Sequence, residues 1–383
     1  MYVGKMLTFC TFLWRIAFLV AVMTYIVMFY RGMGFWTMRH DVTFENLTSQ
    51  HHLNRSKENY LILYYNVPAF ISRYRKYAMS CDFKKCPWNN CELTFDKKYA
   101  RKGDAVIYDG IFIPKKLEFI RPIGQVWIFA AHESPHLYGM GGNSWTNYTF
   151  NWTMTYNKNN TDIHLPYGEL RKRAGDKLRD YEAIARGKNK TSLIIVSNCK
   201  TSSRRQEFVK ELSKYMDIDI LGKCGGKPWD CGTHRVHDEN CFNILNSYKF
   251  YLAFENAFCN QYFSEKFFEN FNYDTIMVTR GGLHGDAKRL FPSGSFISTD
   301  DFRSAKDLAQ YLKGLSVSDY AKLLERKDQF NSIGFKEVYQ QALCDVCYRM
   351  NFQDEYSKVI NDMHEWVLDN KPCLNFNEIK DLT

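Results

Sequence analysis

The segment that begins at residue 251 gathers the polar side chains best suited to hold a charged ligand. The apolar run 251–254 leads into Asn256, and a helix is predicted to open with Tyr262, Glu265 and Lys266. Parallel α/β sheets bind ligands beyond the carboxyl ends of their strands, and a helix N-terminus offers free N–H groups to a phosphate. Lys266 would neutralise a diphosphate leaving group, and Glu265 would hold sugar hydroxyls. A solvated helix face is the alternative for this charged pair.

Two arginines stand at the start of another predicted helix. Arg204 and Arg205 follow the apolar strand 192–196 across a short loop. Arginine forms paired hydrogen bonds with phosphate oxygens, so this strand-to-helix junction suits a pyrophosphate. An exposed helix end is the alternative.

A third candidate lies in the first half of the chain. Glu133 comes just after the apolar run 125–130, where a carboxylate facing a cleft can remove a proton from a sugar hydroxyl. His132 and His136 are competing bases. A turn with solvated charges is the alternative for all three residues.

The pair Cys344-x-x-Cys347 has the spacing of a metal-binding or redox-active site. Cys81, Cys86 and Cys91 are available in the first half of the chain. We therefore favour disulfides that tie the C-terminal segment to the N-terminal lobe, with the connectivity left open.

Asp217 and Asp219 form an Asp-x-Asp, a pattern that metal-dependent glycosyltransferases use. Here the two carboxylates alternate inside an apolar strand and share one sheet face, away from its end. We interpret them as structural, and no obligatory metal is predicted.

These residues need two α/β lobes to position them. Apolar runs at 60–65, 105–108 and 125–130 predict parallel strands of one lobe, and runs at 192–196, 217–221, 251–254 and 275–279 predict a second. A charged segment, 169–190, is predicted to be helical, as is 352–370. In chain order, the sequence predicts a cytoplasmic tail 1–6, a transmembrane signal anchor 7–30, a stem 31–59, an acceptor-side lobe 60–175, a donor-binding lobe 190–345, and a C-terminal helix, 346–383, packing back on the first lobe.

The apolar segment 7–30 has no small-residue cleavage site after it, which favours an uncleaved anchor. Eleven of the twelve cysteines follow it, as expected in an oxidising lumen. Six glycosylation sequons follow it as well, at Asn46, Asn54, Asn147, Asn151, Asn159 and Asn189. The chain is predicted to be a single-pass type II membrane protein with a lumenal globular part.

Composition narrows the possible partners. The formal net charge is +9, but the basic residues are scattered and no zinc-finger spacing, RNA-binding signature or long basic tract appears. Nucleic acid is therefore excluded, and an anionic small molecule such as a nucleoside diphosphate is favoured. A content of 45% hydrophobic and 16% aromatic residues is enough for sizeable cores.

With these residues in view, the chain resembles the α1,3-fucosyltransferases, Golgi type II enzymes that use GDP-fucose. The resemblance is carried by FYLAFEN…QYFSEKFFEN, VWIFAAHESP, FNWTMTYNKNNTDIHLPYG, IIVSNCK…RRQEFVKEL, FPSGSFISTDDFRSAKDLAQYL and ALCDVC. It implies two facing Rossmann-like lobes of the GT-B type, with the donor held mainly by the second.

The resemblance also implies roles for single residues. Glu133 matches the catalytic base, and Arg205 and Lys266 match the pyrophosphate contacts. The other donor-contacting positions are Asn256, Tyr262 and Glu265. The implied reaction is a single inverting transfer of L-fucose from GDP-β-L-fucose, in α1,3 linkage, to GlcNAc of glycoprotein or glycolipid glycans.

The sequence departs from the family at 105–110, where AVIYDG replaces a paired-histidine motif. The acceptor is therefore open between core GlcNAc, LacNAc and LacdiNAc termini. Two alternative functions are a catalytically silent glycan-binding relative and a transferase for another nucleotide sugar. Stimulation by a divalent cation and a homodimer are also left open.

Overall fold

The computed structural model describes residues 57–66, 76, 78–111, 113–114, 116–117, 119–138, 148–175, 179–226, 239–368 and 373–375. The predicted tail and anchor, nearly all of the predicted stem, and the sequons at Asn46, Asn54 and Asn147 lie outside these residues. Among the helices within the described ranges, none combines the length and apolar character that a membrane crossing requires.

The first sheet has six parallel strands in the order β2-β1-β3-β4-β5-β6. Its central strands, β3 and β4, are buried along their whole length, as expected for apolar runs covered on both faces. Short 3-10 turns are among the connections between the strands. The bounds are β1 Tyr60–Asn66, η3 Phe83–Lys85, β2 Cys91–Thr94, η4 Lys97–Tyr99, β3 Ala105–Asp109, β4 Val126–Ala131, η5 Pro135–Leu137, β5 Trp152–Thr155, η7 Lys158–Asn160 and β6 Ile163–His164.

The second sheet has five parallel strands in the order β12-β11-β10-β8-β9. The elements of this lobe are β8 Lys190–Ile195, α4 Arg205–Leu212, β9 Ile218–Leu221, η8 Lys223–Gly225, α5 Glu239–Asn246, β10 Tyr248–Phe254, α6 Glu265–Phe268, β11 Ile276–Arg280, α7 Asp286–Leu290, β12 Ile297–Ser298, η9 Thr299–Asp301, α8 Ala305–Gly314 and α9 Val317–Asp328.

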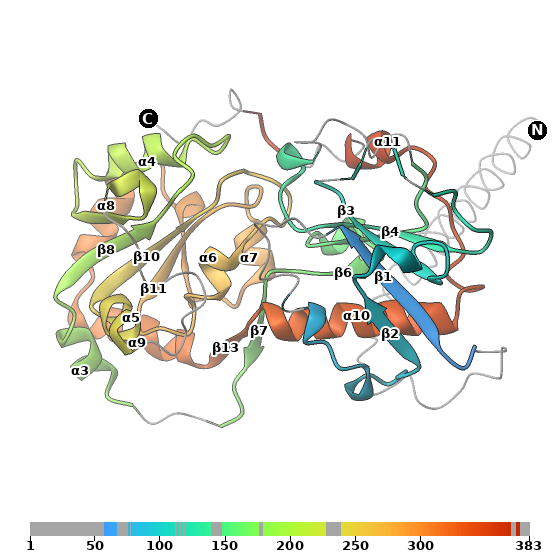
Figure 1. The fold of residues 1–383 in the computed structure, drawn as a ribbon. Coiled ribbons are helices and arrows are strands. Elements are labelled where there is room, and N and C mark those ends of the chain that lie inside the picture. Colours follow the sequence, from blue (N-terminus) through green and yellow to red (C-terminus); the bar gives the residue numbers. More distant parts are fainter. Residues whose placement is uncertain are drawn as a thin grey trace, which may run out of the picture. The chain divides into compact units, whose positions relative to one another are not determined.

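Alternation along β10 divides the core of this lobe. Phe250 and Leu252 pack against α4, α8 and α9, and α4 and α8 lie side by side (Figure 1). Tyr251 and Ala253 face the opposite way, toward the cluster that includes Phe267 and reaches the first sheet. The two faces of one strand therefore serve two different cores.

The segments between and after the lobes differ from the prediction. Residues 169–190 contain β7 Glu169–Lys172, which pairs antiparallel with β13 Phe330–Ile333, and only a six-residue helix, α3 Tyr181–Arg186. Pairing with a distant strand thus overrides the helix-favouring composition. The predicted helix 352–370 is confined to α11 Met363–Leu368, because Ile360 forms an isolated β-bridge with Phe150.

The longest helix within the described ranges, α10 Phe335–Asn351, returns along the first sheet (Figure 1). The predicted domain boundary at residues 345 and 346 falls inside it. Two disulfides, Cys86–Cys344 and Cys91–Cys347, bind this helix to the first lobe across 258 and 256 residues of chain. The Cys-x-x-Cys pair is therefore engaged in disulfides and is not a metal site.

Cys81 was a fifth disulfide candidate, and that expectation is wrong. Both cysteines of the Cys-x-x-Cys pair are already bonded to Cys86 and Cys91, so Cys81 is a free thiol. Between cysteines that the structure describes, two further disulfides join residues that the sequence did not pair, namely Cys199–Cys224 and Cys259–Cys373.

Candidate active site

The candidate site lies where strand ends from the two sheets meet. Glu133 follows the end of β4, and Tyr262 lies in the loop after β10. The Tyr262 hydroxyl donates a hydrogen bond of 2.9 Å to Oε2 of Glu133. A carboxylate of the first lobe is thus held by a side chain that is 129 residues away in the second.

The ring of Tyr262 is fixed by its surroundings. It is 1% exposed, and its centroid lies 5.0 Å from that of Tyr156 and 6.1 Å from that of Tyr167. Both neighbours belong to the first lobe, so aromatic packing between lobes orients the hydroxyl toward Glu133.

Glu133 is half-buried, and burial raises the pKa of its carboxyl. The charge of Glu265 raises this pKa further, whereas Lys266 and hydrogen bonds from Tyr262 and Asn256 lower it. The net direction is upward. A carboxylate whose pKa approaches the working pH is a better proton acceptor than an ordinary glutamate.

The two histidines beside Glu133 have different environments. His132 is 2% exposed and packs against the rings of Tyr167, Phe335 and Tyr339. Burial lowers its pKa to about 3, so its ring is neutral and belongs to the core. His136 is exposed. Glu133, by contrast, accepts the hydrogen bond from the Tyr262 hydroxyl.

Lys266 is surrounded by acceptors. Its Nζ lies 3.1 Å from Oε1 of Glu265, 3.0 Å from the hydroxyl of Ser264 and 3.8 Å from Oε2 of Glu255. Burial lowers the pKa of Lys266, but the two glutamates raise it, and the net direction is upward. The ammonium therefore stays protonated and retains a positive charge for a ligand.

The helix that carries Lys266 begins at Glu265, three residues after the predicted start at Tyr262. α6 spans four residues, and its first-turn amide, the N–H of Lys266, is capped by the Ser264 hydroxyl. So short a helix has only a small dipole, because each residue adds one peptide unit. The positive charge at the site comes from the Lys266 side chain.

Glu255 and Asp109 are buried carboxylates that the sequence did not single out. Glu255 is 0% exposed and accepts hydrogen bonds from the amide and the hydroxyl of Ser264, both at 2.7 Å. Asp109 ends β3, where burial raises its pKa to about 7. Each of these residues stands at the carboxyl end of an apolar strand. That position in the sequence is the feature by which they could have been predicted.

A glycine allows β11 to end close to Glu255. A Cβ on Gly281 would lie 2.5 Å from Cγ of Glu255 and 3.3 Å from the carbonyl oxygen of Tyr262. Any larger residue would displace one of these groups. The glycine following β11 therefore keeps three segments of the site in contact.

Arg205 lies at the start of α4 and is 2% exposed. Its guanidinium donates to the carbonyl oxygens of Phe254, at 3.1 Å, and Asn198, at 2.8 Å. It therefore joins the loops that follow β8 and β10. Its Nε is buried and has no hydrogen-bond partner within the part of the chain that the structure describes.

Asn256 is held by its backbone, whose carbonyl oxygen accepts from the Ser203 amide at 3.1 Å and the Ser202 hydroxyl at 3.2 Å. Its side-chain oxygen is buried and, counting the described residues alone, makes no hydrogen bond. Buried unpaired polar atoms are rare in proteins. Those of Asn256 and Arg205 both lie at the carboxyl edge of the second sheet.

Asp219 lies at the opposite edge of this sheet. It accepts hydrogen bonds from the Tyr248 hydroxyl, at 2.6 Å, and from Nζ of Lys190, at 2.9 Å. Lys190 and Tyr248 are the first residues of β8 and β10. The Asp-x-Asp motif is therefore remote from Glu133 and Lys266.

One cluster of metal-ligand atoms occurs among the described residues. It consists of His136, Cys259 and Cys373, whose ligand atoms lie within 4.8 Å of one another. The two sulfurs are bonded to each other, so they offer no thiolates to a metal.

The three sequons within the described ranges differ in accessibility. Nδ2 of Asn151, the atom to which a glycan would be attached, donates to the carbonyl oxygen of Lys358 at 2.9 Å. Asn159 and Asn189 are exposed.

Comparison with known proteins gives a consistent result. Residues 57–168 match the model described as "Fucosyltransferase, N-terminal", and residues 185–366 match "Glycosyltransferase family 10 (fucosyltransferase) C-term". The chain is 31% identical to a human 4-galactosyl-N-acetylglucosaminide 3-alpha-L-fucosyltransferase over 285 residues, which cover 70% of this chain and 71% of that relative.

It is also 32% identical to glycoprotein 3-alpha-L-fucosyltransferase A of Drosophila melanogaster over 310 residues, covering 78% of this chain but only 59% of that relative. A crystal structure of an alpha1,3-fucosyltransferase with GDP aligns with a TM-score of 0.50 and 15% identity, over 81% of this chain and 95% of that one. At this identity the match concerns the fold alone. The predicted α/β fold with parallel sheets of the GT-B kind is thereby confirmed.

Proposed function

Because this chain belongs to the fucosyltransferases of glycosyltransferase family 10, we propose that it moves L-fucose from GDP-β-L-fucose to GlcNAc of glycoprotein or glycolipid glycans, in α1,3 linkage. The names of the relatives support the donor sugar and the linkage. The observation that carries the proposal is the contact of 2.9 Å between Tyr262 and Glu133, which brings a candidate base of one lobe to the polar cluster of the other.

The reaction is a single displacement with inversion. The acceptor hydroxyl oxygen attacks C1 of fucose from the face opposite the diphosphate, and its proton passes to the Glu133 carboxylate. The bond from C1 to the diphosphate oxygen breaks, and GDP leaves with the electron pair. A well-placed general base contributes roughly 10²–10⁴-fold to such a rate.

Lys266 and Arg205 stabilise the departing diphosphate. Lys266 retains its charge because Glu255 and Glu265 raise its pKa. Arg205 lies at the junction of β8 and α4, with its Nε uncommitted among the described residues. Fixed cations in a partly buried site stabilise a leaving group strongly, and such electrostatic stabilisation usually accelerates a reaction more than any other single effect.

The remaining polar groups orient the donor. Glu265, at 21% side-chain exposure, accepts hydrogen bonds from sugar hydroxyls. Asn256 and Tyr262 contact the donor between Glu133 and the diphosphate. Tyr262 thus contacts both the donor and the base, which couples donor binding to the position of Glu133.

We place the protein in the Golgi membrane as a single-pass type II protein with its catalytic part in the lumen. The four disulfides between described cysteines support an oxidising compartment. The apolar segment 7–30 supports the anchor, and the exposed sequons at Asn159 and Asn189 support the lumenal side.

The proposed function is tested by incubating the full-length chain, in detergent, with GDP-fucose and a glycan array that contains core GlcNAc, LacNAc and LacdiNAc termini. GDP release that depends on acceptor, with one deoxyhexose added to O3 of a GlcNAc, is the expected result. Transfer from GDP-mannose instead, or glycan binding without affinity for GDP-fucose, would contradict it.

A further inference from the structure

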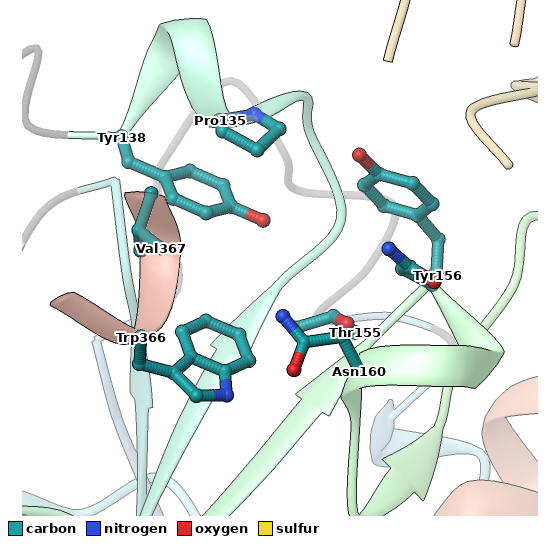
Figure 2. A pocket seen from close by; sticks show the side chains of 8 residues that line it. Pro135, Tyr138, Thr155, Tyr156, Asn160, Trp366 and Val367 are labelled. Carbon is teal, nitrogen blue, oxygen red and sulfur yellow. The ribbon is translucent and has the colours of Figure 1, made fainter. Parts of the chain in front are cut away.

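A small pocket of the first lobe is lined by the turn that follows Glu133 in the chain (Figure 2). It is enclosed by η5 and the residue after it, by the end of β5 and the turn that follows, and by α11. Its lining residues are Pro135, Tyr138, Thr155, Tyr156, Asn157, Asn160, Trp366 and Val367.

Tyr156 links the pocket to the proposed reaction centre. Pro135 is two residues beyond Glu133 in the chain. The ring of Tyr156 packs 5.0 Å from that of Tyr262, which donates to Glu133. Burial raises the pKa of Tyr156, and the nearby Tyr138 and Glu133 raise it further, so these groups share one environment.

Its size excludes a whole sugar ring. The cavity volume is about 20 Å³, little more than the space that one water molecule needs. Only a methyl-sized substituent of a ligand fits inside. The ring that bears such a substituent would remain at the mouth of the pocket.

The lining is apolar on one side and polar on the other. Tyr138 and Trp366 lie on one side of the pocket, and Tyr156 and Asn160 lie across from them (Figure 2). Val367 adds a further apolar wall. Side-chain amides beside apolar walls suit a group that has both a methyl and an amide, because the methyl is buried while the amide is hydrogen-bonded.

We propose that this pocket receives the methyl end of the acetamido group of the acceptor GlcNAc. The inference rests on the proposed function, in which O3 of GlcNAc attacks fucose. C3 of that sugar is bonded to C2, which carries the acetamido group, so the reacting hydroxyl and this group are neighbours. With O3 at Glu133, the methyl of the acetamido group enters the pocket and contacts Trp366 and Val367, while its amide remains at the mouth.

The C-terminal helix α11 completes the pocket. Trp366 is held there by the ring of Phe129, whose centroid lies 5.8 Å away, in the buried strand β4. A C-terminal segment thus selects the acceptor, although it is remote in sequence from Glu133. Trp366 and Val367 determine specificity and have no part in proton transfer.

The test uses the full-length chain, GDP-fucose, and N-acetyllactosamine beside lactose, which differ only in having an acetamido or a hydroxyl group at C2 of the reducing sugar. Chitobiose is included as a second GlcNAc acceptor. When two acceptors differ by one small apolar group that such a pocket binds, their kcat/KM values differ roughly 10–200-fold. The unmodified protein should therefore prefer the acetamido acceptor by at least about tenfold.

Val367→Phe fills the pocket and should reduce that preference to about twofold or less, mainly by raising KM for the acetamido acceptor. Val359→Phe is the matched control, because Val359 is 57% exposed and does not line the pocket. Asn160→Ala should also weaken the preference, and it leaves the sequon at Asn159 intact. Unchanged GDP affinity in each variant would show that the second lobe is folded.

The outcomes separate the two proposals. GDP-fucose turnover without a preference for the acetamido group, or a preference that Val367→Phe and Asn160→Ala leave unchanged, would overturn the pocket assignment alone. Absence of transfer to every GlcNAc acceptor would overturn the proposed function and this inference with it.

Discussion

The hydroxyl of Tyr262 donates a hydrogen bond of 2.9 Å to Oε2 of Glu133, and this bond joins the two lobes at the proposed reaction centre. It favours the charged form of the carboxyl and so lowers its pKa, against burial and Glu265, which raise it. Tyr262 therefore sets both the position and the basicity of Glu133.

Tyr262→Phe should raise the pKa of Glu133, because the carboxylate loses a donor. The acidic limb of the profile of kcat/KM against pH should then move to higher pH. At neutral pH the rate should fall roughly tenfold, about the value of one hydrogen bond to a charged group. Steady-state kinetics from pH 5 to 9 measure this. Tyr148→Phe is the control, because it removes a hydrogen bond of 2.9 Å to the carbonyl oxygen of Pro114. If the pH profile of the Tyr262→Phe variant does not shift, Tyr262 does not set the basicity of Glu133.

Lys266→Ala should weaken GDP binding roughly 10–100-fold, since hydrogen bonds to charged groups are worth about 1.5–3 kcal/mol. Calorimetric titration with GDP measures the affinity, and the Tm should be recorded because Glu255 loses a buried cationic neighbour. Lys288→Ala is the charge-matched control, because Lys288 has 60% side-chain exposure and pairs with Asp301 on the surface. Equal GDP affinity in the two variants would refute the assignment of Lys266.

Arg205→Ala should lower both GDP affinity and stability. The guanidinium donates to the carbonyl oxygens of Phe254 and Asn198, and these acceptors lose their partner when it is removed. Leaving buried acceptors unsatisfied costs about 1–3 kcal/mol. Arg204→Ala removes a neighbouring arginine that pairs with Glu207 on the surface, and it should leave both quantities near normal. Stability loss with unchanged GDP affinity would restrict Arg205 to a structural role.

Removing the two disulfides of α10 should destabilise the first lobe. Each cross-link closes a loop of more than 250 residues, and loss of a native disulfide typically costs about 2–5 kcal/mol. Cys344→Ser and Cys347→Ser should each lower the Tm by several degrees in thermal denaturation. Cys81→Ser is the natural control, because that thiol is free. An unchanged Tm in the double variant Cys344→Ser/Cys347→Ser would show that the helix is held by packing alone.

Much of the fold could be predicted because its strands are long apolar runs. β3, β4 and β11 lie within one residue of the predicted segments, whereas β10 begins three residues before its predicted start. The helices were harder, since their lengths depend on tertiary pairing. β7 lies in a charged stretch that favours a helix, yet it pairs with β13, and α6 ends after one turn.

The candidate site was predictable to the extent that chemistry follows strand ends. Glu133, Asn256 and Lys266 were found in that way, and the structure brings them into one cluster. Glu255 was missed as a site residue because nothing in the sequence shows that its carboxylate turns inward to Ser264. The pocket at Trp366 could not be predicted from the sequence either, because it depends on where a short C-terminal helix packs.

The proton acceptor is the centre of this account, and Glu133→Gln tests it most directly. Single-turnover measurement with GDP-fucose and a GlcNAc acceptor, paired with a GDP titration, separates chemistry from donor binding. We predict a loss of about 10²–10⁴-fold in the rate of transfer, with GDP affinity within about twofold of normal. Transfer at the unmodified rate would contradict the assignment and would require another base.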